Sequence, residues 1–516
     1  MKISLQRIAT LVGAAISLAI AVPAAAQVAT TLDPSILPFN QPSRTVLAAS
    51  PRKVFAHWHE FPFRYYGDPS ATDGYAVSLN PAGFSDQFFG AGNWMRNRPI
   101  PLAEAVQVDT DADAQKDLAL DVALAANIGI DAFLLNCWYG PEDFRWQAQM
   151  VGMFNAADAY SSRNVAGFSV VPNIDASLMA ARLQANPNDP VAVPETVADN
   201  LATLKSHRSF MRMGTKYMVG AFAVEYLPVS WYQRFLSRLK IAHGMDVYFS
   251  GVFVDPTKRP AYASLLQLYS RWTIDPYTQI TSEASDKAWA SSRGIAFMSD
   301  VAQSYDRPLN LITSETGGFQ TEIETWTRAI NDGAQAVQII TWNDHSEGTN
   351  LRPNTSSQYA FYDIAAYYIS WYKTGVKPTI TRDVLYYSHR MEPTTAPHDA
   401  TKQAGAYVSK NGVPFENNVY LVGFLTQPGS LEIRSGGTLH QQAVGAGVQS
   451  MSAPLAVNDR PQFSLVRGGL TKVSVVSAFG TRSKSLWQDL LYRAGGSTRS
   501  TVASVQNNLP EDRWTH

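Results

Sequence analysis

Two carboxylate residues, Asp344 and Glu347, stand three residues apart directly after the apolar, β-branched run 338–342. Carboxyl groups with this spacing on one turn can act on a single bond of a substrate. Each negative charge also affects its neighbour, so that the two pKa values separate and one group can be an acid while the other is a base. The alternative interpretation is a solvated loop with an Asx turn at Asn343 and Asp344. The elements that position this pair therefore have to be considered.

Short apolar runs that read as strands alternate with amphipathic runs that read as helices along most of the chain. The strand candidates are residues 54–58, 131–138, 168–173, 217–222, 247–253, 272–274, 294–298 and 336–342. Helical patterns lie at 110–129, 197–205, 231–242, 321–331 and 358–373. Eight β units with helical crossovers predict an α/β fold of the (β/α)8 barrel type. A doubly wound open sheet is the alternative, but no glycine-rich phosphate loop follows the first strand.

Chemistry in such a barrel is placed at the carboxyl ends of the strands, because the interior is packed with branched apolar side chains. Seven of the eight predicted strands end in polar or aromatic residues. Each of these residues could by itself be a helix cap or a turn. In chain order they include His57, Trp58 and His59; Asn136, Trp138 and Tyr139; Asp175; Glu225; Asp255; Asp275; and Trp342, Asn343, Asp344, His345 and Glu347.

The N-terminal residues predict export, and the charge composition argues against a nucleic-acid partner. Residues 1–26 carry Lys2 and Arg7, then an apolar stretch, then three alanines, which is the order of a secretory signal peptide. We therefore expect an exported protein, periplasmic or extracellular, without stable membrane insertion after cleavage. The formal net charge is −1 without a basic block, so nucleic acid is not an expected partner. The single cysteine, Cys137, excludes an internal disulfide.

The residue pattern changes beyond Pro378, where short strand patterns are separated by turn residues. Examples are residues 418–425, 430–433 and 472–476. These patterns predict a small all-β domain, a sandwich, over 378–494. The barrel is expected to span residues 27–377, and the Ser, Arg and Gly-rich residues 495–516 are expected to form a loosely ordered tail.

Three stretches resemble glycoside hydrolase family 71, the α-1,3-glucanases called mutanases. They are residues 54–57, residues 129–136, and above all Ile340-Thr341-Trp342-Asn343-Asp344 followed by Glu347. Residues 418–435 and 445–448 also resemble the sandwich domain of that family. His345 and the run Glu347-Gly348-Thr349 are locally similar to the related family 99 endo-α-mannosidases. The resemblance implies an inverting endo-α-1,3-glucanase on a (β/α)8 barrel, with Asp344 and Glu347 as the catalytic pair.

This interpretation assigns roles to the strand-end residues. Glu347 is the expected general acid toward the leaving oxygen, and Asp344 is the expected base that acts on water. In a family 99 type of reaction, the first carboxylate would instead assist attack by the sugar's own hydroxyl group. Candidate stacking platforms for sugars are Trp58, Trp138, Tyr139 and Trp342. Candidates for hydroxyl recognition are His57, Asn136, Asp175, Glu225, Asp255 and Asp275.

Two further alternatives remain open at this point. His57 and His59 on a first barrel strand also suit a metal hydrolase of the amidohydrolase type, with Asp344 as its eighth-strand acid. That design needs more His or Lys ligands at later strand ends, whereas His207 precedes its strand and His243 lies in a helix. We therefore expect no metal and no other cofactor. The second alternative is an exported barrel that binds a polysaccharide without cleaving it.

Overall fold

The structure is a computed structural model that describes residues 36–59, 96–100, 111–143, 145–401, 403–485 and 487–499. The predicted signal peptide and most of the predicted C-terminal tail lie outside these residues. Within the described ranges, no helix is both long and apolar enough to cross a membrane.

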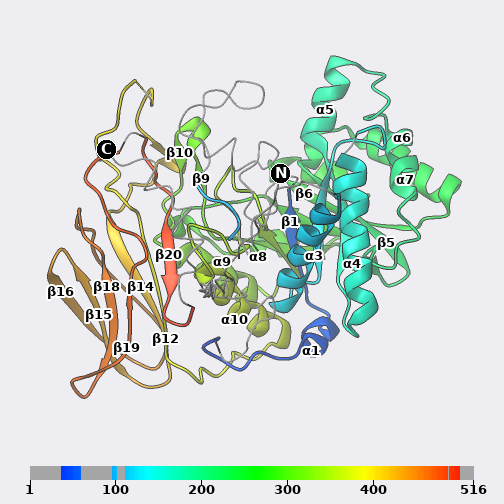
Figure 1. Cartoon of the computed structure of the whole chain (residues 1–516). Coiled ribbons are helices and arrows are strands. Elements are labelled where there is room, and N and C mark those ends of the chain that lie inside the picture. The colour runs from blue at the N-terminus through cyan, green and yellow to red at the C-terminus, as the bar shows by residue number, and fades with distance from the viewer. Residues whose placement is uncertain are drawn as a thin grey trace, which may run out of the picture.

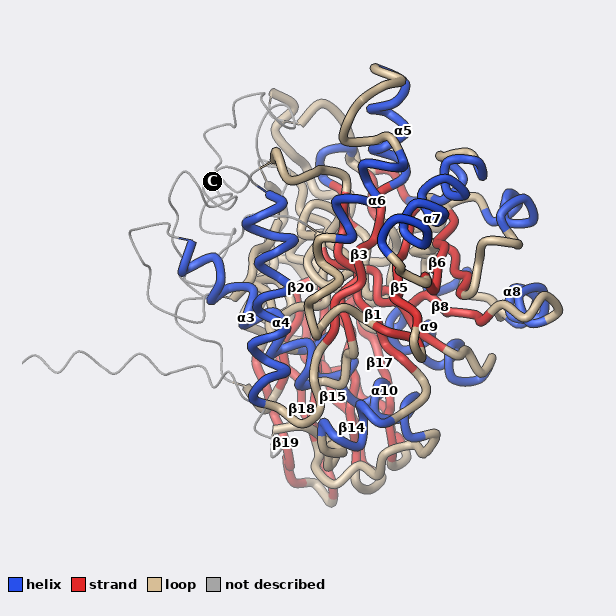
Figure 2. Tube along the Cα trace, turned by 90° about the vertical axis from the view of Figure 1, so that its right-hand side faces the viewer, coloured by secondary structure: helices blue, strands red, loops and turns tan. Residues whose placement is uncertain are grey.

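Eight parallel strands form a closed barrel, which Figure 2 shows in red. They are β1 (Lys53–Trp58), β2 (Ala132–Cys137), β3 (Ser169–Asp175), β5 (Lys216–Phe222), β6 (Val247–Phe253), β7 (Leu268–Arg271), β8 (Ala296–Ala302) and β11 (Ala336–Ile340). The order β3-β2-β1-β11-β8-β7-β6-β5 closes because β3 also pairs with β5. The predicted (β/α)8 barrel is therefore confirmed, and the open-sheet alternative is wrong. A short strand, β4 (Arg212–Met213), runs antiparallel to β5.

The sixth barrel strand was predicted at residues 272–274, and this placement is wrong. The strand β7 lies at Leu268–Arg271, where Leu268, Tyr269 and Ser270 are all buried. Residues 272–274 continue beyond it toward the barrel mouth, and only one backbone hydrogen bond, from Trp272 N to Phe253 O, extends the ladder. The aromatic and β-branched character of Trp272, Thr273 and Ile274 reflects this location at the mouth and not membership of the strand.

Helices cover the outside of the barrel, as Figures 1 and 2 show. They are α1 (Arg44–Ala49), α3 (Asp111–Asn127), α4 (Gly152–Arg163), α5 (Ala176–Ala185), α6 (Pro194–Ala202), α7 (Val229–His243), α8 (Ala284–Ser291), α9 (Gln320–Asn331) and α10 (Ala360–Thr374). Helix α3 ends at Asn127 because Gly129 follows with φ +101°. A Cβ atom at Gly129 would lie 2.8 Å from Ile369 of α10, so a close approach as well as the backbone conformation requires glycine there.

The barrel interior is layered. The lower layer is apolar and comprises Phe55, Ala132, Leu134, Val171, Met211, Met218, Val252, Leu268, Met298 and Ala336. A small second cluster of Ile274, Ala302 and Ile340 packs with the rings of Trp272 and Tyr305. Polar side chains, including those of His57 and Gln338, are also buried. Branched and apolar side chains thus fill the base of the barrel and leave polar groups to its carboxyl end.

The C-terminal region is all-β, as predicted, and lies beside the barrel at the left of Figure 1. One antiparallel sheet contains β12 (Val384–His389), β14 (Asn418–Leu425), β17 (Gly447–Pro454) and β20 (Arg493–Gly496). The other contains β15 (Gly429–Ser435), β16 (Thr438–Val444), β18 (Gln462–Arg467) and β19 (Leu470–Val476). The rings of Tyr387 in β12 and Phe463 in β18 stack at 4.9 Å between centroids, which joins the two sheets.

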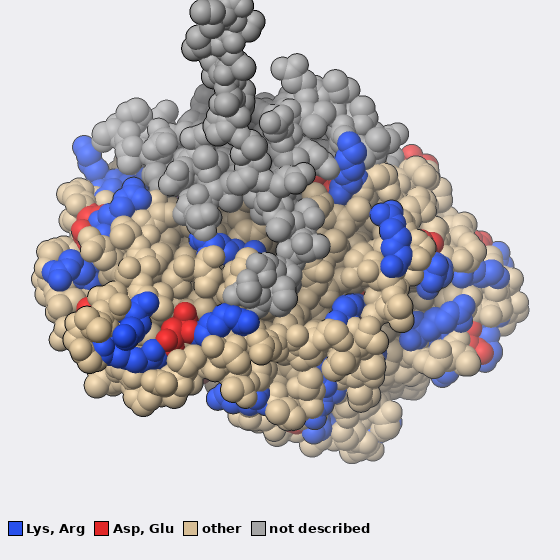
Figure 3. All heavy atoms as spheres, turned by 60° about the horizontal axis from the view of Figure 1, so that its bottom comes forward, with Lys and Arg blue, Asp and Glu red and all other residues tan. Residues whose placement is uncertain are grey.

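Two features join the C-terminal region to the barrel. Helix α10 is buried over almost its whole length, and the ring of its Tyr367 lies 5.1 Å from that of Phe424 in β14. A small sheet also joins β9 (Asp306–Arg307) and β10 (Ile312–Thr313), which follow the barrel strand β8, to β13 (Val408–Ser409) of the C-terminal region. On the face shown in Figure 3, basic and acidic side chains are scattered among uncharged residues.

Candidate active site

Asp344 and Glu347 lie on a tight loop that follows β11. One oxygen of Asp344, Oδ1, accepts hydrogen bonds from the backbone N–H of Ser346 (2.9 Å), the hydroxyl of Ser346 (2.6 Å) and the backbone N–H of Glu347 (3.0 Å). The Asx-type turn considered as the alternative is therefore present. Among the described residues, no group donates to its other oxygen, Oδ2.

The loop also has backbone support. Thr341 N donates to Thr349 O, Thr349 N donates to Asp344 O, and Asp344 N donates to the hydroxyl of Thr341 (2.9 Å). Gly348 adopts φ +61°, and a Cβ atom there would lie 3.2 Å from the carbonyl oxygen of Asp306. A glycine is needed at this position to let the loop fold against β9.

Glu347 has the properties of a proton donor. Burial, followed by the nearby negative charge of Asp344, raises its pKa to about 7 from 4.5, although Arg307 and Lys410 act in the opposite direction. Arg307 Nη1 lies 3.2 Å from Glu347 Oε1. A carboxyl group that still holds its proton near neutral pH can give it to a leaving oxygen.

His57 lies in the barrel interior rather than on an open surface. Its Nε2 is 2.8 Å from Gln338 Oε1, and its ring meets that of Trp272 edge to face at 4.7 Å. Burial lowers the pKa of His57 to about 3, so the imidazole is neutral. Gln338 also donates to Ser270 Oγ (2.8 Å), and the ring of Phe222 lies 4.7 Å from that of Trp272. His57 therefore belongs to a polar and aromatic cluster within the barrel.

Trp58 and Trp342 are not placed as stacking platforms, which corrects that prediction. Both rings are buried, and both indole N–H groups donate to Asp121 of α3, at 2.9 Å from Trp58 and 2.7 Å from Trp342. Arg352 Nη1 lies 3.1 Å from the same carboxylate. Along β1, Trp58 points to the helices because its neighbour His57 points into the barrel. Trp342 lies two residues beyond the end of β11 and reaches Asp121 from the loop. The node formed by Asp121, Trp58, Trp342 and Arg352 positions the chain just before Asp344.

Asn343 and His345 also support the loop. The side chain of Asn343 accepts from His59 N (2.7 Å) and donates to His59 O (2.6 Å), which ties the ends of β1 and β11 together. His345 is buried with Nδ1 2.6 Å from Asn97 Oδ1, and burial lowers its pKa well below the usual value. Asn343 and His345 therefore hold backbone and neighbouring loops, and His59 remains half-buried at the barrel mouth.

The ends of β2 and β3 meet through Asn136, whose Nδ2 donates to Asp175 Oδ2 (3.3 Å). Asp175 also caps helix α5 by accepting from Leu178 N. Beyond β2, Trp138 remains half-buried and Tyr139 is buried. The guanidinium of Arg145 lies 4.2 Å from the Trp138 ring centroid and 5.1 Å from that of Tyr139.

The ends of β5, β6 and β7 carry the three remaining candidates. Asp255 caps a 3-10 helix (Pro256–Tyr262) through Thr257 N, and its own N–H donates to Glu225 Oε1. Asp275 is half-buried, and burial together with the charge of Asp300 raises its pKa. Capping is thus an established role for Asp255, whereas no described group donates to the carboxylate of Asp275.

Several neighbours of the carboxylate pair were missed from the sequence. Tyr305 and Arg307 follow β8, the one barrel strand for which we named no polar end. The polar run 303–307 could have indicated site residues at the end of this strand. It was overlooked because the predicted strand stopped at Met298, four residues before the end of β8. Lys410 comes from the C-terminal region, and no local pattern could have placed it near Glu347.

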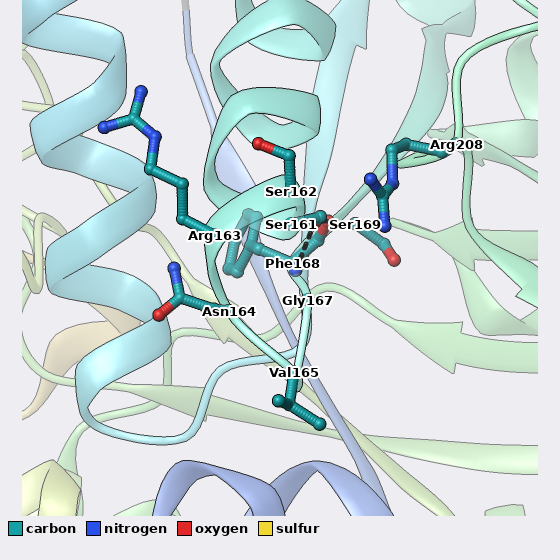
Figure 4. A pocket seen from close by; sticks show the side chains of 9 residues that line it. All are labelled: Ser161, Ser162, Arg163, Asn164, Val165, Gly167, Phe168, Ser169 and Arg208. Carbon is teal, nitrogen blue, oxygen red and sulfur yellow. Dashed lines mark hydrogen bonds between the residues drawn. The ribbon is translucent and has the colours of Figure 1, made fainter.

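A pocket of about 460 Å³ lies away from the carboxylate loop, at the end of α4 and the start of β3. Residues 161–165, 167–169 and Arg208 line it, and Figure 4 shows their side chains, which include two arginines and three serines. This is the amino end of the barrel strands, which in barrel enzymes serves stability. Within the described residues, no group of three or more His, Cys, Asp or Glu side chains could hold a metal ion.

Comparisons with known proteins agree with this arrangement. The model of glycosyl hydrolase family 71 matches residues 103–490. Two relatives from Schizosaccharomyces pombe (strain 972 / ATCC 24843) are each 24% identical and align with 69% of this chain. They are an ascus wall endo-1,3-alpha-glucanase, with 87% of its length covered over 407 residues, and the glucan endo-1,3-alpha-glucosidase agn1, with 84% covered over 380 residues.

Among solved structures, the GH99 endo-alpha-mannosidase from Bacteroides thetaiotaomicron is similar at a TM-score of 0.46 and 14% identity, covering 62% of this chain and 97% of that one. The family match includes the strands of the barrel from β2 onward, the carboxylate loop and most of the C-terminal sheets. The chain therefore belongs to glycosyl hydrolase family 71, as the resemblance predicted, and it is a glycoside hydrolase.

Proposed function

We propose that the protein is an exported endo-α-1,3-glucanase that inverts the anomeric configuration, with Glu347 as the general acid and Asp344 as the base. The bond type is supported by the two relatives named for activity on α-1,3-glucan. The roles are supported by the electrostatics of the loop, because Glu347 keeps its proton to about pH 7.

The geometry suits a division of labour between the two carboxyl groups. Three donors hold Asp344 Oδ1, so the carboxylate has a fixed orientation, and its Oδ2 can accept a proton from an attacking water molecule. The proton of Glu347 passes to the glycosidic oxygen as the bond between that oxygen and the anomeric carbon breaks. Water supplies the new oxygen to the anomeric carbon, and its proton goes to Asp344.

The remaining finer assignments are proposals of the same kind. Trp138 is the candidate for sugar stacking that stays partly exposed, and Asn136, Asp175 and Asp275 are candidates for hydroxyl recognition. The two C-terminal sheets are proposed to form a sandwich, since Tyr387 and Phe463 stack between them.

The test is a panel of α-glucans and mannans with reducing-sugar release as the readout, together with the product anomer by proton NMR. We expect release from α-1,3-glucan and an inverted first product. Asp344→Asn and Glu347→Gln should each lower turnover by about 10²- to 10⁴-fold. An oligosaccharyl fluoride needs little protonation, so it should partly restore Glu347→Gln but not Asp344→Asn.

Other outcomes point to other functions. A retained anomer would favour participation by a substrate hydroxyl group, with Asp344 assisting it. Binding of a polysaccharide without release of reducing ends would favour a non-catalytic role. Near-full activity of both variants would show that the loop is structural and that the reaction centre lies elsewhere.

A further inference from the structure

Lys410 is a charged residue of the C-terminal region that lies near the carboxylate loop of the barrel. It opens a short 3-10 helix (Lys410–Gly412) immediately after β13. Its Nζ lies 4.1 Å from the centroid of the Tyr305 ring, and Tyr305 belongs to the segment after β8. A cation at this distance from an aromatic face is attracted to it, so the ring is a platform that holds the ammonium group.

A continuous ladder of backbone hydrogen bonds connects Lys410 to the catalytic loop. Ser409 pairs with Thr313 in β10, and Thr313 pairs with Asp306 in β9. Asp306 N then donates to the carbonyl oxygen of Glu347 (2.7 Å). The position of the ammonium group is therefore set by sheet pairing and not by a free surface loop.

Tyr305 also packs beside the segments that carry the two carboxyl groups affected by Lys410. Its ring packs on the cluster of Ile274, Ala302 and Ile340 at the barrel mouth. Ile274 precedes Asp275, and Glu347 lies on the loop that follows Ile340. The charge of Lys410 interacts favourably with both Glu347 and Asp275, while burial lowers the pKa of Lys410 itself.

Within the part of the chain that the structure describes, Lys410 and Asp275 have hydrogen-bonding capacity that is not used. Among the described residues, no acceptor bonds the ammonium group of Lys410, and no donor bonds the carboxylate of Asp275. Both side chains are only partly exposed. A partly buried ammonium and a partly buried carboxylate that lack hydrogen-bond partners among the described residues, beside an aromatic ring, are suited to the hydroxyl groups and the apolar face of a sugar.

We propose that Lys410, Asp275 and Tyr305 form the subsite for the sugar unit that departs after cleavage, with Lys410 supplied by the C-terminal region. The inference rests on the proposed role of Glu347 as general acid, because that carboxyl group faces the leaving oxygen. The ammonium group of Lys410 donates to hydroxyl groups of the departing unit, and Asp275 accepts from them. The C-terminal region thereby takes part in substrate recognition.

The test compares Lys410→Met, which keeps the stem and removes the charge, with Lys410→Arg, which keeps the charge. The matched control is Lys377→Met, because Lys377 also lies over an aromatic ring, Trp371 at 5.0 Å, but stands beyond the end of α10. Each variant is assayed on an α-1,3-glucan oligosaccharide and on an α-1,3-glucan oligosaccharyl fluoride, which has no leaving sugar.

For Lys410→Met we expect kcat/KM on the oligosaccharide to fall about 10- to 100-fold, as for a lost hydrogen bond to a charged group. The loss on the fluoride should be about threefold or less. Since the positive charge of Lys410 lowers the pKa of Glu347, its removal should also move the alkaline limb of the pH profile to higher pH. Lys410→Arg should recover part of the activity, and Lys377→Met should behave as wild type.

The proposed subsite would be overturned if Lys410→Met lost kcat/KM equally on the oligosaccharide and the fluoride, or lost none on either, and if the alkaline limb of its pH profile stayed where it is in the wild type. A wild-type enzyme that cleaves another polysaccharide but not α-1,3-glucan would contradict the proposed substrate alone. The Lys410 comparison would then be made on that polymer, where the same selective loss is expected. A wild-type enzyme without activity on any polymer would overturn both proposals.

Discussion

Replacing Glu347 by glutamine should make the protein more stable at alkaline pH, and this effect can be measured without knowing the substrate. The pKa of Glu347 is raised from 4.5 to about 7 in the folded state. The folded protein therefore binds a proton more tightly than the unfolded chain does. The stability that this proton contributes is fully present below pH 4.5 and is lost as the pH rises through 7.

The size of the effect follows from the shift. One pKa unit corresponds to 1.36 kcal/mol, so the rise from 4.5 to about 7 amounts to about 3 kcal/mol at most. The Glu347 side chain is 22% exposed, which reduces this value through solvent screening to about 2 kcal/mol. Glutamine resembles the neutral acid, so Glu347→Gln should match wild type near pH 4.5 and exceed it by this amount at pH 8.5.

Thermal midpoints measured by calorimetry at pH 4.5 and pH 8.5 provide the assay. The matched control is Glu142→Gln, because Glu142 is an exposed glutamate and its replacement should leave the difference between the two pH values unchanged. If Glu347→Gln shifts the midpoint equally at both pH values, or lowers it at pH 8.5, Glu347 is not a carboxyl group that burial and Asp344 keep protonated.

Two further predictions concern the support of the loop. The Asp121 carboxylate accepts from at least three donors, those of Trp58, Trp342 and Arg352, and Asp121→Asn replaces it by an amide that also donates. This variant should cost about 3 kcal/mol of folding stability and lower kcat more than it changes KM. The exposed Asp246→Asn should do neither. Unchanged kcat in a folded Asp121→Asn protein would remove its positioning role. Gly348→Ala should cost about 1–2 kcal/mol and reduce turnover, because its φ is +61° and its neighbours are Leu491 and the backbone of Asp306. Gly333→Ala has a similar φ of +64° but meets only the flexible end of Lys287, so equal losses of turnover in both variants would contradict this account.

Much of the barrel could be predicted from the sequence because buried strands leave a local signal. Residues 247–253 form a continuous run of apolar or small residues, and residues 336–340 are apolar except for Gln338; both segments are strands. The strand β7 was predicted too late in the sequence because Trp272 and Ile274 are residue types that favour strands, although they line the barrel mouth. The local sequence shows that a residue prefers an apolar environment, but it does not show whether that environment is a strand. The mouth of this barrel is apolar beyond the last hydrogen bonds between its strands.

The site was less predictable because several of its contacts join distant segments. Asp344 and Glu347 are close in sequence, and their motif could be recognised. The burial of Trp58 and Trp342 depends on Asp121, a helix residue 63 and 221 positions away along the chain. Lys410 reaches Tyr305 only through the pairing of β13 with β10. No periodicity in a single sequence encodes such pairings.

Helix α10 lies between the barrel and the C-terminal sheets, and this position limits where the chain can be cut. One side of it holds the barrel, where the Tyr362 hydroxyl donates to Leu124 O and the Lys373 ammonium lies 2.6 Å from Asp131. Its other side holds the C-terminal sheets through Tyr367 and Phe424. A chain cut after this helix would present an aromatic surface to water and tend to aggregate. Exchange of C-terminal regions between relatives would therefore require the helix to be transplanted or redesigned together with the sheets.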